Sequence, residues 1–94
     1  MVNPMEKSIE KIRTLKNKMV SRRENNELVL IPMVNDVADM NEILILNEVA
    51  GFIWDNIEKY NTFNDILDDV VTNFNVEKNQ AQNDINEFLR EFDN

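Results

Sequence analysis

The side chains able to perform chemistry are few, and a run of aspartates is the most suggestive group among them. Asp65, Asp68 and Asp69 lie about one helical turn apart and could form a metal site or an acid–base pair. The sequence has no His and no Cys, which excludes imidazole bases, thiolate nucleophiles and most zinc ligand sets. No Gly-bearing calcium loop accompanies the aspartates, and Ser8 and Ser21 have no base to activate them. We therefore expect a solvated helix face, and a protein that is not an enzyme and binds no metal or cofactor.

The elements that must position any functional surface belong to one domain, because separate cores arise only beyond about 250 residues and this chain has 94. Its charge is divided unevenly. Residues 1–23 carry seven basic and two acidic side chains, whereas the rest of the chain carries three basic and sixteen acidic ones. We expect residues 1–18 to form a basic N-terminal arm and residues 19–94 to form the domain proper. The arm either lies on its own acidic domain or meets an acidic partner.

The arm also carries a helix signal. Asn3 followed by Pro4 is typical of an N-cap and a first helical position. Apolar side chains then follow at helical spacing, at Met5, Ile9, Ile12 and Leu15. This spacing predicts a short amphipathic helix within the arm.

The next part of the chain reads as strands and the last part as helices. Residues 19–23 and 27–33 are typical of a hairpin around residues 24–26, residues 35–41 of a polar loop, and residues 42–46 of a third strand. From Asn47 the apolar period changes to 3.6, which predicts helices over 47–57, 62–74 and 77–92. Asn47 and Thr62 are the expected N-caps, the latter with Asp65 in a capping box. The order predicts an α+β fold, a three-stranded antiparallel sheet followed by three helices.

The strands are apolar on both faces at residues 28–31 and 43–46, although a sheet covered on one side should alternate. We expect the apolar stripe of the arm to cover the second face, in this chain or in a dimer mate. Trp54 and the apolar residues of the last helix have the spacing of core side chains.

The sequence LNEVAGFIW at residues 46–54, followed by Thr62 with Ile66 and then by Val76, resembles the PqqD-like family, named for pyrroloquinoline quinone biosynthesis protein D. The last helix completes the likeness with Asp84, Ile85, Phe88 and Leu89. The resemblance covers residues 18–92. It implies a small winged-helix-like domain that binds the leader segment of a ribosomally synthesised precursor peptide. It also implies a separate maturase, commonly a radical S-adenosylmethionine enzyme, to which the domain presents the peptide as a chaperone.

In that family the leader adds as an extra strand to the third strand and lies against the third helix. Carried onto this chain, the resemblance places peptide contacts on the strand at Glu42, Ile43, Leu44, Ile45 and Leu46. It places contacts on the helix at Asp84, Ile85, Phe88 and Leu89. Residues 43–46 contain neither Pro nor Lys, the usual guards of a strand edge. From the residues alone, an ordinary internal strand is the other interpretation. Leu44→Pro is expected to abolish docking because proline removes a ladder donor.

Two other functions stay open. Winged-helix folds often bind DNA, but the last helix has two basic and four acidic side chains, the wrong sign for phosphate. We therefore expect no nucleic-acid partner. A dimeric adaptor that uses the same strand edge is the second alternative, so the chain is a monomer or a homodimer. The sequence has no apolar run near the roughly 20 residues of a membrane span and no signal-peptide pattern, which favours the cytoplasm and no membrane contact.

Overall fold

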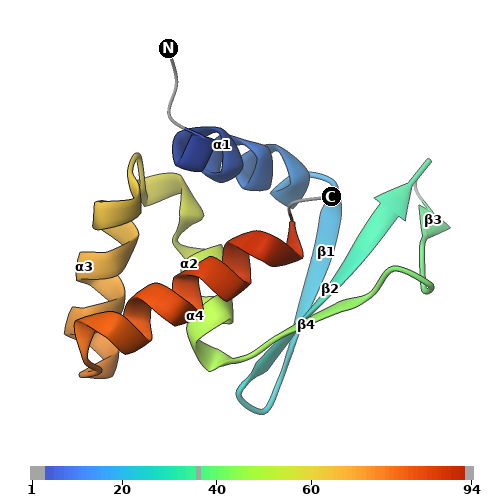
Figure 1. Ribbon diagram of the computed structural model, residues 1–94. Helices are drawn as coiled ribbons and strands as arrows, with labels where there is room; N and C mark the ends of the chain where they lie inside the picture. Colours follow the sequence, from blue (N-terminus) through green and yellow to red (C-terminus); the bar gives the residue numbers. More distant parts are fainter. Residues whose placement is uncertain (1–3, 36, 93–94) are drawn as a thin grey trace.

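The computed structural model describes residues 4–35 and 37–92, with side chains from residue 7 onward. The helices are α1 (Pro4–Lys16), α2 (Glu48–Asp55), α3 (Phe63–Phe74) and α4 (Lys78–Glu91), with a 3-10 turn η1 (Ile57–Lys59). The strands are β1 (Met19–Glu24), β2 (Glu27–Val34), β3 (Val37–Ala38) and β4 (Leu44–Leu46). Figure 1 shows the helices gathered on one side of the molecule and the sheet on the other. The fold is α+β with an antiparallel sheet, as predicted.

The sheet is built around β2, which pairs with β1 on one side and with β4 on the other. The β1–β2 hairpin turns at Asn25, whose φ of 56° lies in the left-handed region that Asn tolerates. On the other side, Leu46 pairs with Leu28 and Leu44 pairs with Leu30. The hairpin predicted from residues 19–33 is therefore confirmed.

Two predictions about the sheet are wrong. The expected polar loop contains the short strand β3, because Asn35 adopts a φ of 53° and turns the chain back so that Val37 pairs with Val34. The described sheet thus has four strands instead of three. The predicted strand 42–46 shortens to Leu44–Leu46, since its pairing with β2 ends where Leu44 meets Leu30.

The helix starts follow the sequence signals closely. The Asn47 side chain accepts a hydrogen bond from the Ala50 backbone N–H at 2.9 Å and so caps α2. Thr62 and Asp65 form the expected capping box at the start of α3. Asn75, with a φ of 52°, ends α3 in the left-handed conformation. These local contacts define where α2 and α3 begin and where α3 ends.

The core lies between the helices and one face of the sheet. Leu28, Leu30 and Leu46 point from the strands into it, and Trp54 from α2 is 1% exposed. The Trp54 ring stacks on Phe92 with ring centroids 5.5 Å apart. Four apolar residues of the last helix, of which the spacing predicts that some are core, are all buried: Ile85, Phe88, Leu89 and Phe92.

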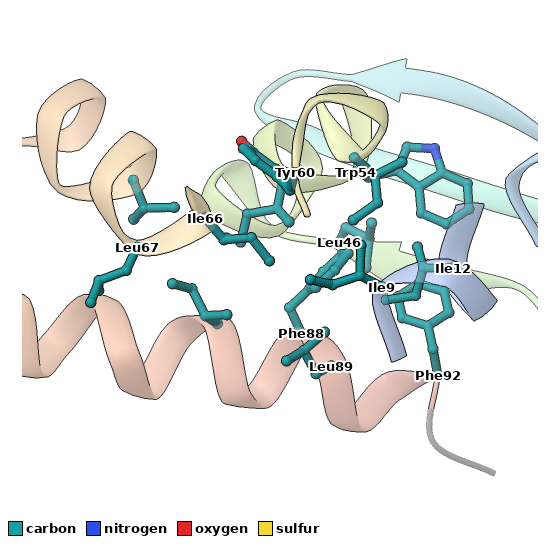
Figure 2. Packing of buried hydrophobic residues seen from close by; sticks show 14 of the residues in the cluster. Ile9, Ile12, Leu46, Trp54, Tyr60, Ile66, Leu67, Phe88, Leu89 and Phe92 are labelled. Atoms are coloured by element: carbon teal, nitrogen blue, oxygen red, sulfur yellow. The ribbon is translucent and has the colours of Figure 1, made fainter. Parts of the chain in front are cut away.

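Helix α1 belongs to this same core, which corrects the expected role of the arm. Ile9 and Ile12 are 1% and 0% exposed and lie among Leu46, Phe88 and Phe92 (Figure 2). Met5, the first apolar residue of the predicted stripe, lies outside the residues whose side chains are described. The stripe therefore packs on the helical side of the sheet instead of covering its second face.

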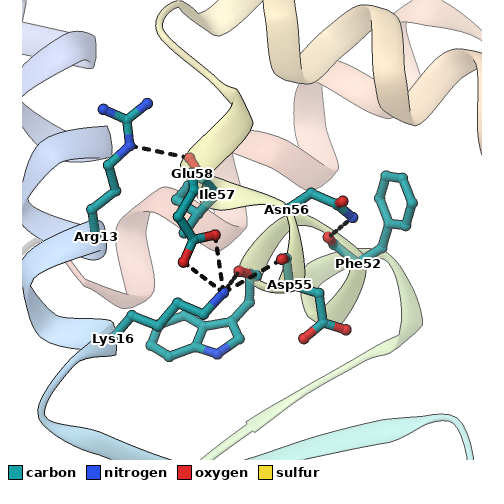
Figure 3. Close-up of polar contacts among 8 residues, drawn as sticks. Arg13, Lys16, Phe52, Asp55, Asn56, Ile57 and Glu58 are labelled. Carbon is teal, nitrogen blue, oxygen red and sulfur yellow. Dashed lines mark hydrogen bonds and ion pairs between the residues drawn. The ribbon is translucent and has the colours of Figure 1, made fainter.

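Polar contacts hold α1 in this place. Arg13 Nε donates to the Ile57 carbonyl at 3.2 Å, and Lys16 Nζ donates to the Trp54 carbonyl at 2.9 Å. Lys16 also forms an ion pair with Glu58 (Figure 3). The pKa of Glu58 is lowered mainly by a backbone hydrogen bond and further by this contact with Lys16. Arg13 and Lys16 of the basic arm therefore lie against the chain's own η1 and α2.

The second face of the sheet stays open. Its side chains include Val20 and Ile45, which are 50% and 62% exposed, and the half-buried Val29 and Ile31. No helix of the described chain covers them. The sheet therefore presents exposed apolar side chains next to the edge strand β4.

Candidate functional site

Hydrogen bonds at the end of β2 distant from β4 show which backbone groups of β4 face outward. The Met33 N–H donates to the Lys18 carbonyl at 2.9 Å, on the β1 side. The Asp39 N–H donates to the Pro32 carbonyl at 2.8 Å, on the opposite side. Because backbone groups alternate along a strand, even-numbered residues of β2 direct their polar backbone groups away from β1 and toward β4.

This alternation identifies the residue that faces the free edge. Leu44 and Leu46 pair with even-numbered residues of β2, so their N–H and C=O groups point into the sheet. Ile45 therefore points its N–H and C=O groups outward, where no described strand pairs with β4. Its side chain lies on the open face of the sheet and is 62% exposed. Ile45 is thus the residue able to pair with an added strand.

Two hollows lie along this edge, between β4 and α4. The larger, about 380 Å³, is lined on the strand side by Ile43 and Leu44 and on the helix side by Phe92. The smaller, about 80 Å³, lies between Leu46 and Phe88. Glu91 lines both hollows, so they are neighbours along α4, and together we call them the groove. The later residues of β4 meet the earlier residues of α4, so strand and helix run in opposite directions.

The structure brings together most of the site residues expected from the sequence. The larger hollow is lined by Glu42, Ile43 and Leu44, and the smaller by Ile45, Leu46, Asp84 and Phe88. Ile85 and Leu89 line neither hollow; both are buried in the hydrophobic core. They support the helical wall from behind.

Several groove residues were not anticipated. Leu15 and Lys11 from α1, together with Met19 and Pro32 from the hairpin, close the larger hollow. The contribution of Leu15 and Lys11 depends on where α1 docks, which no local sequence signal specifies. Glu87 and Glu91 also line the groove, and the helical spacing of Asp84, Glu87 and Glu91 was a signal that could have found them.

The helical wall of the groove is acidic. Asp84, Glu87 and Glu91 all line the smaller hollow, and no basic side chain lines it. Within the described part of the chain, none of the three forms an ion pair. Asp84 accepts a hydrogen bond from Gln80 Nε2 at 2.9 Å. The groove therefore offers three carboxylates that form no ion pair with the described residues.

The aspartates of α3 have structural roles. Backbone N–H groups of Asn61 and Thr62 donate to Asp65 and lower its pKa. The Tyr60 hydroxyl donates to Asp69 at 2.7 Å; burial raises the pKa of Tyr60, and this hydrogen bond raises it further. Among the described residues, no three potential ligand side chains are grouped so as to hold a metal ion. Asp65 therefore caps α3 and Asp69 braces it, whereas Asp68 lies on the exposed helix face.

The fold and the groove together define a small α+β domain that offers one open strand edge beside a helix. Within the described chain, no helix has the length and apolarity to cross a membrane. The chain belongs to the PqqD family, since the family model for coenzyme PQQ synthesis protein D (PqqD) matches residues 27–94. Neither the curated proteins nor the solved structures that were searched give a match.

The matched residues run from β2 to the end of the chain and include both walls of the groove. They leave out α1 and β1, although α1 contributes to the core and to the larger hollow. Membership of the family indicates a role in biosynthesis of the PQQ type, in which the protein works alongside a biosynthetic partner.

Proposed function

We propose that this protein binds the leader segment of a ribosomally synthesised precursor peptide and presents it to a separate modifying enzyme of the radical S-adenosylmethionine class. The protein itself is a peptide chaperone and catalyses no reaction. The leader adds as a strand to the free edge of β4 and lies in the groove against α4. The family membership supports this role, and the outward-facing backbone of Ile45 is the observation that carries it.

Strand addition needs an unpaired edge that can bond to any backbone, and neighbouring hollows that select side chains. Ile45 supplies the edge, and the hollows on either side of it supply the selection. A winged-helix-like arrangement that binds peptide instead of DNA is part of this proposal, as the family membership implies. DNA binding is disfavoured because the exposed side of α4 carries Asp84, Glu87 and Glu91, which repel phosphate.

The proline test follows from the hydrogen-bond directions. Leu44→Pro would remove a bond inside the sheet, because the Leu44 N–H faces β2. Ile45→Pro instead removes an outward donor, and an edge strand tolerates proline where its N–H faces solvent. Ile45→Thr is the matched control, since it keeps the N–H and also changes the exposed side chain.

Each form is tagged and used to capture peptides and proteins from the source cells, followed by mass spectrometry. The native protein and Ile45→Thr should recover a small precursor together with a maturase. Ile45→Pro should stay folded by circular dichroism and bind the recovered leader at least about tenfold more weakly, the effect of losing about 1.4 kcal/mol. Equal binding by Ile45→Pro contradicts strand addition at this edge. Recovery of DNA, or of the domain alone, supports the regulator or the dimeric adaptor instead.

A further inference from the structure

We infer that the groove selects leaders by a three-residue pattern: a large apolar residue and a basic residue, separated by one apolar residue that lies beside Ile45. This inference rests on the proposed strand addition and names the class of peptide that it selects. The docking surface is the open edge of β4 with its two hollows, and the charges of α4 decide which occupant fits.

The central position follows from the geometry of pairing. A residue opposite Ile45 places its side chain on the same face of the sheet as the Ile45 side chain. That face is the open one, where Ile45 is 62% exposed next to its pairing partner Val29. An apolar side chain at this position therefore extends an apolar surface, whereas a charged one would be placed against it.

The two flanking positions lie on the other face, toward α4, and are separated by about 6.7 Å. One of them lies beside Leu44 and the larger hollow, whose apolar lining includes Leu15, Met19 and Phe92. Its volume of about 380 Å³ accommodates a large apolar side chain. The groove therefore has an anchor position at one end of the pattern.

The other flanking position lies beside Leu46 and the smaller hollow. That hollow, at about 80 Å³, is too small to enclose a large side chain, and its charged lining consists of Asp84, Glu87 and Glu91. Glu87 and Glu91 are about 6 Å apart along the helix axis, at about 1.5 Å per residue. A Lys or Arg side chain extended along the wall reaches both carboxylates, and a Glu or Asp there is repelled by them.

The test uses nitrogen-15 NMR titration of the full chain with synthetic peptides. Each peptide places Phe-Val-Arg or Arg-Val-Phe between two Thr pairs, because the direction of the added strand is not fixed. One control replaces Arg by Glu, and a second places Phe and Arg next to each other, which puts them on opposite faces. Amide shifts at Ile45 report the pairing, and the dissociation constants report the selection.

The alternating Arg peptide, in one of its two directions, should bind about tenfold more tightly than the Glu peptide at low salt and also more tightly than the permuted one. The double variant Glu87→Gln, Glu91→Gln should reduce this preference to about twofold or less. A matched double variant, Glu10→Gln with Asp68→Asn, removes the same charge from exposed positions that line neither groove hollow and should keep the preference.

Several results overturn the inference. If the Arg and Glu peptides both shift Ile45 with equal affinity, strand addition stands and the charge selection is wrong. If the captured natural leader binds with sensitivity to Ile45→Pro but lacks the pattern, only the inference fails. If no peptide shifts Ile45 and no leader is captured, the inference and the proposed function fail together. A dimer whose Ile45 amide is protected before any peptide is added shows that a second copy occupies the edge.

Discussion

The buried side of α1 gives the most direct quantitative test of the fold. Ile12 is 0% exposed and packs in the same cluster as Leu28, Leu30 and Phe88, although it lies outside the residues that the family model matches. We predict that Ile12→Ala destabilises the whole domain. Truncation of a buried isoleucine removes its transfer free energy and leaves a cavity, which together cost about 2–5 kcal/mol.

This cost is large for a chain of 94 residues. Domains of this size have a free energy of unfolding of about 5–14 kcal/mol, at about 0.05–0.15 kcal/mol per residue. Each kcal/mol corresponds to about 4–8 °C in Tm, so a loss of about 3 kcal/mol lowers Tm by about 12–24 °C. Urea unfolding followed by circular dichroism should show one cooperative transition at a lower midpoint with an unchanged slope.

The control is Glu10→Ala, an exposed position on the same helix. Surface substitutions of this kind change stability by about 0.5 kcal/mol or less. If Ile12→Ala unfolds at the same urea concentration as Glu10→Ala, α1 does not pack in the core. The domain would then begin near the start of the family match, and α1 would not close the larger hollow.

Two further predictions concern the pH dependence of stability. Asp65 has a pKa lowered below its ordinary value of 3.8, so its contribution to stability is present above that value and is lost as the pH falls through the lowered pKa. Asp65→Asn should therefore reduce the fall in the free energy of unfolding at acid pH, measured by urea titrations between about pH 7 and about pH 2. Tyr60, the sole Tyr of the chain, has a raised pKa, so the folded protein should show no phenolate absorbance at about pH 10, where unfolded Tyr titrates. Because only the unfolded chain loses this proton there, the stability of the fold should decrease as the pH rises above about 10. Asp69→Asn should move the Tyr60 transition to lower pH, although burial keeps it above the ordinary value; an unchanged titration would show that the hydrogen bond to Asp69 has no influence.

The sequence predicts those parts of the fold that depend on neighbouring residues. The Asn47 cap, the Thr62 capping box and the turn at Asn25 each join groups within about four positions, so their residue types are sufficient evidence. The amphipathic period also identifies which residues of α4 are buried. A family resemblance was needed to favour β4 as a docking edge over an internal strand.

Other parts depend on contacts between distant segments. The place of α1 is fixed by bonds such as that from Lys16 to the Trp54 carbonyl, across 38 positions of the chain. The direction of the Ile45 backbone depends on the register between β2 and β4, in which a shift of one residue would exchange the two faces. Neither could be derived from local patterns, and for this reason the expected covering of the second face and the Leu44→Pro test needed correction.

The outer strands β1 and β4, on opposite sides of β2, differ in their charged side chains. The exposed strand β1 carries Arg22, Arg23 and Glu24; Arg22 pairs with Glu24, and Arg23 pairs with Asp55. Charged side chains of this kind are a common guard against edge-to-edge pairing. β4 has no charged residue, and Ile45 presents both an open backbone and an apolar side chain. Under the proposed function, this difference disfavours a peptide strand at β1 and favours one at β4, beside the acidic side chains of α4.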